Sequence, residues 1–245
     1  MKNKLKLETN SFSLHIMAMV CMLCDHLWGT SFVHHEIFTC IGRLAFPIYA
    51  FMIVEGYFHT KNLRNYVKRL FLFAILSEIP FNLVMGSRLF FPIHQNVLWS
   101  FLISIGLMHW NEKAKEKPIW QKMLVGIATL GIAYIGGIIT FVDYQNAGIL
   151  MVLAFYFFRG KKWWNLLGQL LCLWYLNCEL LGGFGYEIKL FGNTHFVERQ
   201  GFALLALIPI WLYKGKQGYH SKQLQAVYYA FYPLHLLLLG ILKSL

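Results

Sequence analysis

Long apolar segments recur along the whole chain, and they constrain its fold more than any other feature. A helix that crosses the hydrocarbon core of a bilayer needs about 20 apolar residues, within a range of about 17–25. By this measure nine segments are expected to span a membrane: 12–32, 36–59, 66–85, 94–110, 119–140, 146–158, 163–181, 201–213 and 225–243. The eighth is short enough to be a re-entrant or strongly buried segment. The sequence therefore predicts an all-α polytopic transmembrane helical bundle, formed by one domain at residues 1–245.

The composition excludes a soluble protein. Of the 245 residues 58% are hydrophobic and 13% are charged, whereas an ordinary globular chain has about 25% charged residues. The first apolar segment contains Asp25 and His26 and has no small-residue cleavage motif after it, so we do not expect a cleavable signal peptide. The five cysteines are odd in number and mostly lie in apolar segments, which indicates buried thiols rather than disulfides or a metal site.

The positive charge predicts the orientation of the chain in the membrane. A net charge of +11 also attracts nucleic acid, but cytoplasmic loops of membrane proteins are rich in Lys and Arg, and we therefore expect no nucleic-acid partner. With the N-terminus inside, 17 of the 22 basic residues lie on the cytoplasmic side, and Arg43 lies within a span. The four on the outer side are Arg88, Lys189, Arg199 and Lys243. This distribution predicts nine spans with the N-terminus inside and the C-terminus outside.

One outer segment is longer and more polar than the others. Residues 182–200 (GGFGYEIKLFGNTHFVERQ) separate the seventh and eighth predicted spans. The segment is either a plain connector or a surface that contacts an external substrate, and the sequence leaves both open. His34 and His35 lie in a short outer loop, where we expect them to be solvated.

Ionisable and amide side chains within the apolar segments mark a candidate site. Ionisable groups at this depth cost several kcal/mol, so they face the bundle interior and indicate function. Six such groups are present: Asp25, His26, Arg43, Glu55, Glu78 and His235. From a helical rise of about 1.5 Å per residue, most of them lie in the outer half of the first four helices, together with Asn82 and Asn96. Glu55 lies in the cytoplasmic half of its span, and His235 lies near the centre of the last one.

Structural and functional interpretations of this cluster remain open at the level of sequence. In the structural interpretation, Arg43 forms an ion pair with Asp25 or with Glu78 that holds the bundle together, and His26 is a hydrogen-bonded core histidine. In the functional interpretation, a carboxylate next to His26 makes the imidazole a general base. Adjacent helical residues point about 100° apart, so Asp25 is also free to pair with a neighbouring helix. Pro47 and Pro80 lie beside the cluster and favour a cavity there.

Several motifs in these segments resemble the TraX family. They are Asp25-His26, residues 41–51 (IGRLAFPIYAF), 54–57 (VEGY), 59–60 (HT), 69–70 (RL), 77–83 (SEIPFNL), 95–97 (QNV) and 228–235 (YYAFYPLH). The resemblance is densest over 14–106 and 200–236. It implies a multi-pass acetyltransferase of the bacterial plasma membrane, similar to the protein that acetylates a conjugative pilin. Such an enzyme takes acetyl from cytosolic acetyl-CoA and transfers it to an amine, or alternatively a hydroxyl, of an exported peptide, pilin-like protein or glycan.

The resemblance also assigns expected roles to the polar residues. His26 best matches the intramembrane histidine that serves as the catalytic candidate in related acyltransferases, and Asp25 or Glu78 would orient it. Arg43, Asn82 and Asn96 would donate hydrogen bonds to the acetyl carbonyl oxygen. The expected residues for acetyl-CoA are the basic loop Lys61, Arg64, Lys68 and Arg69, together with Glu55 and His235. The same basic loop is also explained by its topological role alone, and no metal is expected.

Two other classes of protein fit the same residues. In a proton-coupled transporter or permease, the buried ionisable groups would form a relay. In a non-catalytic assembly protein of the cell envelope, they would be structural pairs. We find no convincing similarity between the halves of the chain, which disfavours a transporter built from inverted repeats. Membrane lipid is an expected partner in every case, and the sequence leaves the oligomeric state open.

Overall fold

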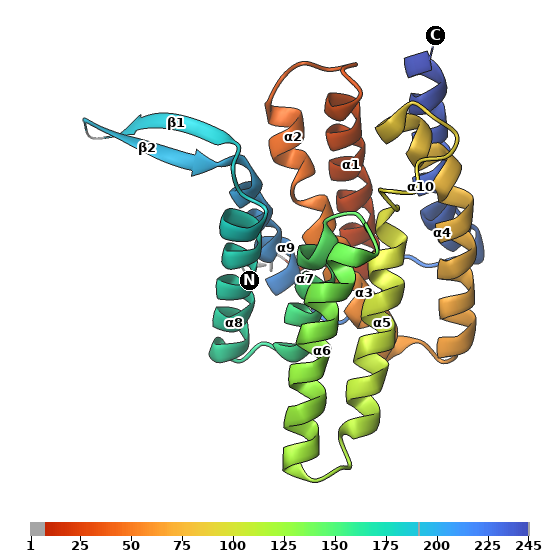
Figure 1. Cartoon of the computed structure of the whole chain (residues 1–245), viewed down its shortest axis with the longest axis vertical. Coiled ribbons are helices and arrows are strands. Elements are labelled where there is room, and N and C mark those ends of the chain that lie inside the picture. Colours follow the sequence, from red (N-terminus) through yellow and green to blue (C-terminus); the bar gives the residue numbers. More distant parts are fainter. Residues whose placement is uncertain (1–7, 191, 245) are drawn as a thin grey trace, which may run out of the picture.

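The chain forms a bundle of helices with one small sheet at its edge (Figure 1). The computed structural model describes residues 8–190 and 192–244. Its α-helices are α1 (Ser11–Gly29), α2 (Ile37–Gly42), α3 (Ala45–His59), α4 (Leu63–Gly86), α5 (Val97–Ala114), α6 (Ile119–Ile139), α7 (Gln145–Phe157), α8 (Trp163–Trp174), α9 (Leu207–Trp211) and α10 (Lys222–Ser244). A π-helical segment, Tyr175–Leu180, follows α8, and a 3₁₀ segment, Arg199–Ala206, precedes α9. The antiparallel strands β1 (Gly185–Leu190) and β2 (Asn193–Glu198) form the sheet.

Each predicted span contains helical structure, and the helices run alternately up and down the bundle (Figure 1). Within the described residues, five helical segments are long and apolar enough to cross a membrane: Ser11–Gly29, Ile37–His59, Leu63–Gly86, Ile119–Ile139 and Lys222–Ser244. Shorter apolar helices occupy Gln145–Phe157 and Arg199–Trp211. The chain is therefore a helical membrane protein, as its apolar segments predicted, whereas the number of crossings and their direction stay predictions.

Local sequence explains where several helices begin and break. The side chains of Asn10, Asn62 and Asn96 each accept a hydrogen bond from a backbone N–H in the first turn of α1, α4 and α5, which satisfies donors that the helix itself leaves free. The second predicted span is divided at residues 43–44, and Pro47 lies in the first turn of α3, where proline is tolerated.

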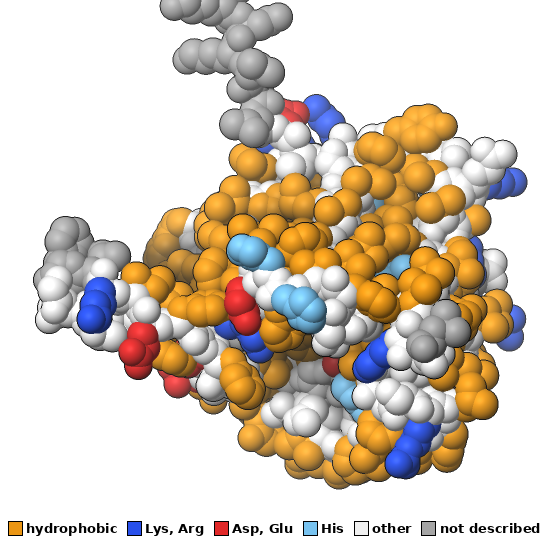
Figure 2. Space-filling view, turned by 90° about the horizontal axis from the view of Figure 1, so that it is seen from above, with side chains coloured by type: hydrophobic (Ala, Val, Ile, Leu, Met, Phe, Trp, Pro, Cys, Tyr) orange, Lys and Arg blue, Asp and Glu red, His pale blue; other side chains and the backbone are white. Residues whose placement is uncertain are grey.

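The short helix α7 forms the centre of the bundle, and the longer helices surround it. Ten of its 13 residues are buried, from Asn146 to Tyr156 with few exceptions. In contrast, α6 exposes large apolar side chains along most of its length, including Ile127 and Ile135. Figure 2 shows apolar side chains over much of the surface at the end that carries the sheet. A soluble protein rarely exposes so much apolar surface, and lipid is the solvent that suits it.

The polar segment 182–200 departs from the all-α prediction, because it forms the β1–β2 hairpin. Its base is attached to the turn between α1 and α2. The Tyr186 hydroxyl donates a hydrogen bond to Glu36 Oε2 at 2.6 Å, and the Arg199 guanidinium lies 4.8 Å from the Trp28 ring centroid. Polar and apolar residues alternate in this segment, and this period of two is the sequence signal of a strand pair that a search for long apolar segments does not detect.

Candidate functional site

Two histidines from opposite ends of the sequence meet inside the bundle. His26 lies near the end of α1 and His235 lies in α10, 209 positions later. His26 Nδ1 is 2.7 Å from His235 Nε2, and the planes of the two rings differ by 8°. His235 is buried, and its Nδ1 is 2.6 Å from the backbone oxygen of Phe231. A carbonyl oxygen, an imidazole and a second imidazole thus form one continuous chain.

This chain of hydrogen bonds fixes the tautomers of the two neutral rings. The carbonyl of Phe231 can only accept, so Nδ1 of His235 carries the proton and Nε2 carries the lone pair. That lone pair accepts from Nδ1 of His26, which leaves the lone pair of His26 on Nε2. Within the described residues no group forms a hydrogen bond with His26 Nε2, and this nitrogen is not completely buried. We call this chain, from the Phe231 carbonyl through His235 to His26, the histidine relay. It ends on the Nε2 lone pair of His26, which no described protein group occupies.

The neighbouring residue Asp25 points to a different helix. Its Oδ1 accepts a hydrogen bond from the Arg43 guanidinium and another from the Thr39 hydroxyl at 3.0 Å. The side chains of Asp25 and Arg43 are only 20% and 17% exposed, so their charges are largely removed from water. Arg43 also donates to Gln200 Oε1 at 3.2 Å, which links the pair to the segment that follows β2. Of the two ion pairs that the sequence allowed for Arg43, the structure contains the one with Asp25.

Gly42 allows α1 and α2 to approach each other beside this pair. A Cβ atom at position 42 would lie 2.4 Å from Cβ and 2.7 Å from Oδ1 of Asp25. No side chain larger than hydrogen fits there unless the two helices separate. Gly42, which precedes Arg43 in the motif, is therefore needed for the close packing of α1 against α2.

The turn before α7 brings strained backbone next to the same cluster. Tyr144 and Gln145 have φ values of 59° and 46°, a region that non-glycine residues rarely occupy. The Tyr144 ring stacks on Phe46 at a centroid distance of 4.2 Å, and its hydroxyl is close enough to Arg43 to interact with the charge. Residues held in such conformations cluster at functional sites, because the surrounding structure must maintain them.

Glu78 and Asn96 form a separate structural network. Glu78 Oε1 accepts from the Asn96 backbone N–H at 3.1 Å, from the Asn96 amide and from Trp99 Nε1 at 2.7 Å. The Asn96 amide also donates to the Ala74 carbonyl, so both of its N–H bonds are used. The structure thus does not bring Glu78 to His26 as an orienting group, and it leaves Asn96 no side-chain donor for a substrate. These two residues fix the start of α5.

Asn82 lies one turn after Glu78 and is buried. Its amide donates to the backbone oxygen of Leu89 at 3.2 Å, while its Oδ1 has no hydrogen-bond partner within the described residues. No hydrogen bond joins Asn82 to His26 or Arg43 in the described part of the chain. Its place in the candidate site therefore stays a prediction.

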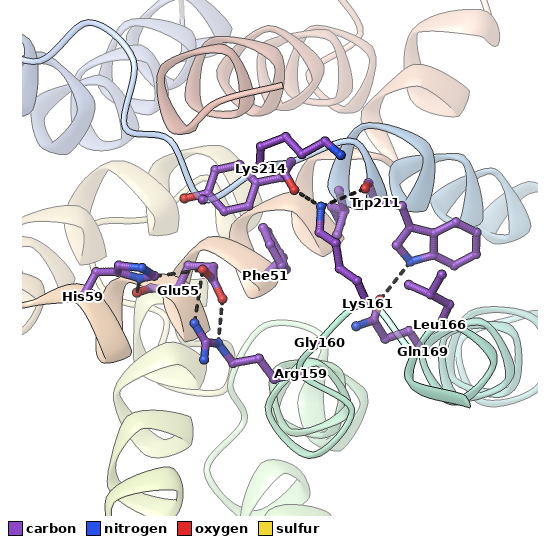
Figure 3. Close-up of a pocket in the computed structure, with 13 residues that line it drawn as sticks. Phe51, Glu55, His59, Arg159, Gly160, Lys161, Leu166, Gln169, Trp211 and Lys214 are labelled. Atoms are coloured by element: carbon purple, nitrogen blue, oxygen red, sulfur yellow. Dashed lines mark hydrogen bonds and ion pairs between the residues drawn. The ribbon is translucent and has the colours of Figure 1, made fainter. Parts of the chain in front are cut away.

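The residues predicted to bind acetyl-CoA fall into three places. His235 belongs to the histidine relay. Glu55 forms a two-point ion pair with Arg159, with Oε1 2.7 Å from Nε, and both side chains line a cavity (Figure 3). This cavity lies where α3 ends and α8 begins, at the end of the bundle opposite to the hairpin (Figure 1). The basic residues Lys61, Arg64, Lys68 and Arg69 are exposed at the beginning of α4 and outside this cavity.

The sequence interpretation missed several polar residues that interact with Arg43 directly or through Gln200: Thr39, Asp143, Tyr144, Asn177 and Gln200. One signal was available for some of them, because the run Asp143-Tyr144-Gln145-Asn146 interrupts two apolar segments. Gln200 ends the outer segment 182–200, for which the sequence left a connector and a substrate-contacting surface open, and only the folded chain places its amide between Arg43 and Asn177.

Comparison with known proteins gives two matches. A family model described as "TraX protein" matches residues 11–243. The chain is also similar to "Probable fimbrial assembly protein FimC, serogroup H1" of Dichelobacter nodosus, with 23% identity over 258 aligned positions and 95% of each chain covered. No solved structure matches the chain significantly.

Proposed function

Since the chain belongs to the TraX family, we propose that it transfers an acetyl group from cytosolic acetyl-CoA to an amine of an exported protein. The single observation that supports this chemistry best is the relay Phe231 carbonyl–His235–His26, which leaves a lone pair on His26 Nε2. Transfer of acetyl from a thioester to an amine requires a group that removes a proton from the attacking nitrogen. An imidazole with a fixed tautomer meets that requirement.

The proton has a defined path in this proposal. His26 Nε2 accepts it as the amine nitrogen attacks the acetyl carbonyl carbon and the C–N bond forms. The positive charge on His26 is then shared with His235, whose Nε2 accepts from His26 Nδ1. When the C–S bond breaks, the protonated His26 returns the proton to the leaving thiolate. The products are an amide and a thiol, and the relay regains its starting state.

Arg43 supplies positive charge close to this reaction. Its Nε–H and three of its other N–H bonds are directed to Thr39, Gln200 and Asp25. A guanidinium has five N–H donors, so one remains for the developing oxyanion of the acetyl carbonyl. Asp25 holds the guanidinium in place, and this positioning role differs from the orientation of His26 that the sequence suggested.

The comparisons favour a pilin-type acceptor. The relative from Dichelobacter nodosus is named for fimbrial assembly and matches over nearly the full length of both chains. We therefore propose the N-terminal amine of a fimbrial subunit as the acceptor and the bacterial plasma membrane as the location. The hairpin β1–β2 lies at the same end of the bundle as the His26 end of α1, where an exported subunit would approach (Figure 1).

The test uses the purified full-length protein in nanodiscs with acetyl-CoA and a peptide that carries the N-terminus of a fimbrial subunit. Mass spectrometry should detect one added acetyl group on the α-amine, and free thiol should be released in equal amount. A peptide whose α-amine is already blocked is the matched control. Release of neither product, at protein concentrations that allow one turnover, would contradict acetyl transfer and favour a transporter or an assembly protein.

A further inference from the structure

A cavity of about 340 Å³, shown in Figure 3, lies where α3 ends and α8 begins. These helix ends are at the end of the bundle opposite to the hairpin (Figure 1). The cavity is enclosed by α3, the segment 158–162, α8, α9 and the residues after α9. This is the end that the distribution of basic residues predicts to be cytoplasmic. Its size is within the range of about 300–1,000 Å³ that is typical of small-molecule sites.

The charged lining of this cavity is predominantly positive. Arg159, Lys161 and Lys214 line it together with one carboxylate, Glu55, so three positive charges face one negative charge. The carboxylate is neutralised by Arg159 through two hydrogen bonds at 2.7 and 3.4 Å. Lys161 and Lys214 therefore provide the excess positive charge.

The ammonium group of Lys214 has no partner in the part of the chain that the structure describes, since it forms no hydrogen bond and no ion pair there. Lys161 donates to the carbonyl oxygens of Tyr213 and of Trp211, the latter at 3.1 Å, which leaves one of its three N–H bonds free. Burial and the neighbouring charge of Lys214 lower the pKa of Lys161. An anion bound between the two ammonium groups would remove this repulsion.

The walls of the cavity are fixed by buried polar contacts. The Gln169 amide donates to the Phe158 carbonyl at 2.8 Å, and its oxygen accepts from Trp211 Nε1 at 2.9 Å. Gly160 has a φ of +136°, and a Cβ there would lie 2.4 Å from Asn165 Nδ2. The basic segment is therefore held in one conformation next to the positive N-terminal end of α8.

We propose that this cavity binds phosphate groups, and specifically the nucleotide end of the acyl donor. The identity of the ligand rests on the proposed function, whereas the preference for phosphate rests on the cavity itself. Two unneutralised ammonium groups on a rigid wall suit a multiply charged anion. The loop at Lys61 and Lys68 offers comparable charge but does not line this cavity, so we assign the ligand to the cavity instead.

The first experiment measures binding of adenosine 3′,5′-bisphosphate to the full-length protein in phosphatidylcholine nanodiscs. Lys214→Gln should weaken binding about tenfold, as expected for the loss of one charge-assisted hydrogen bond, and Lys214→Glu should weaken it further. Lys216→Gln is the matched control, because Lys216 is two positions away, pairs with Glu8 and does not line the cavity. Lys61→Gln with Lys68→Gln tests the competing loop. Neither control should change the dissociation constant more than about twofold, within ordinary surface effects.

The possible outcomes distinguish a failure of the phosphate-site proposal from a failure of the proposed reaction. Binding that depends on Lys214 supports the cavity even if no acetyl transfer is detected. If the wild-type protein does not bind the nucleotide, and Lys214→Glu still transfers acetyl with an unchanged KM for acetyl-CoA, the proposed phosphate site in the cavity is wrong. The proposed reaction is then still supported. A parallel measurement in nanodiscs with phosphatidylglycerol identifies the other phosphate source. If the protein binds phosphatidylglycerol in a way that depends on Lys214 and does not bind the nucleotide, the assignment of the cavity to the acyl donor is wrong.

Discussion

His26 is the residue on which the proposed chemistry depends most directly. A structural histidine needs hydrogen-bonding capacity, which an amide partly supplies, whereas a general base needs a lone pair that can accept a proton. His26→Gln should therefore insert and fold but lose acetyl transfer by about 10²-fold or more, the scale of acid–base catalysis. His34→Gln and His35→Gln are controls, because both residues lie in the exposed loop between α1 and α2. A rate close to wild type in His26→Gln would exclude this residue as the base.

His235 acts on the reaction through His26 and is a positioning residue. It must accept a hydrogen bond from His26 Nδ1. In His235→Gln the amide oxygen can still accept this bond, whereas His235→Leu removes the acceptor and leaves the buried donor unpaired. We expect the Gln variant to keep substantially more activity than the Leu variant and the dependence of kcat on pH to shift in both. Equal loss of activity in both variants, with unchanged pH profiles, would indicate that His235 only packs.

Part of this site was predictable from single residues, and part was not. The cost of ionisable groups in hydrocarbon identified Asp25, His26, Arg43 and His235. Their pairing was not predictable, because adjacent positions on α1 face different neighbours. Asp25 faces α2 and His26 faces α10, which is 209 residues away in sequence. Only the packing of the helices decides which side chain each one meets.

At the scale of helices, Gly42 controls the approach of α1 to α2. In Gly42→Ala the new methyl group would overlap with Asp25 Cβ, so the helices must separate and the contact between Asp25 and Arg43 weakens. Overpacking of this kind costs about 1–3 kcal/mol, and thermal unfolding in detergent should begin at lower temperature. Gly106→Ala in α5 is the control, because its Cβ would meet no atom within 4 Å. Equal thermal stability of the two variants would contradict the packing role of Gly42.

The structural role of Glu78 can be separated from a catalytic one. Its carboxylate accepts three hydrogen bonds from the beginning of α5. Glu78→Gln removes the charge and introduces a donor, which should cost about 1–3 kcal/mol of stability. The kcat should change little at temperatures where the variant is folded, since Glu78 does not contact His26 in the described structure. A drop in kcat without a change in thermal stability would instead return Glu78 to the catalytic residues.

The helices were more predictable than the irregular elements between them. Apolar length located segments that become α1, α4, α6 and α10, because burial in lipid leaves the backbone no alternative to a helix. The hairpin of residues 185–198 was not predicted, since it lies outside the apolar segments and depends on contacts with the α1–α2 turn. The π-helical and 3₁₀ segments that flank it also have no signal in apolar length.

At the scale of the whole molecule, the two proposed sites lie at different depths. The histidine relay lies near the end of α1 where the hairpin is attached, and the basic cavity lies at the opposite end (Figure 1). A donor with a long, flexible chain between its phosphates and its thioester suits such a separation. The nucleotide end would stay on the cytoplasmic side while the acetyl group reaches the acceptor from within the bundle.

This arrangement requires a defined orientation of the chain in the membrane. The segments that follow α5, α7 and α9 lie at the end opposite to the hairpin (Figure 1). They contain Lys115, Arg159, Lys161 and Lys214, and basic turns face the cytoplasm. The last helix, α10, runs from that end to the other, so the C-terminus is predicted to lie outside. A C-terminal alkaline phosphatase, active only outside the cytoplasm, should be active, and a C-terminal green fluorescent protein should stay dark. The reverse result would contradict nine crossings with the N-terminus inside. Either one helix fewer would cross the membrane, or the whole chain would be inverted and the phosphate cavity would face away from its cytosolic ligand.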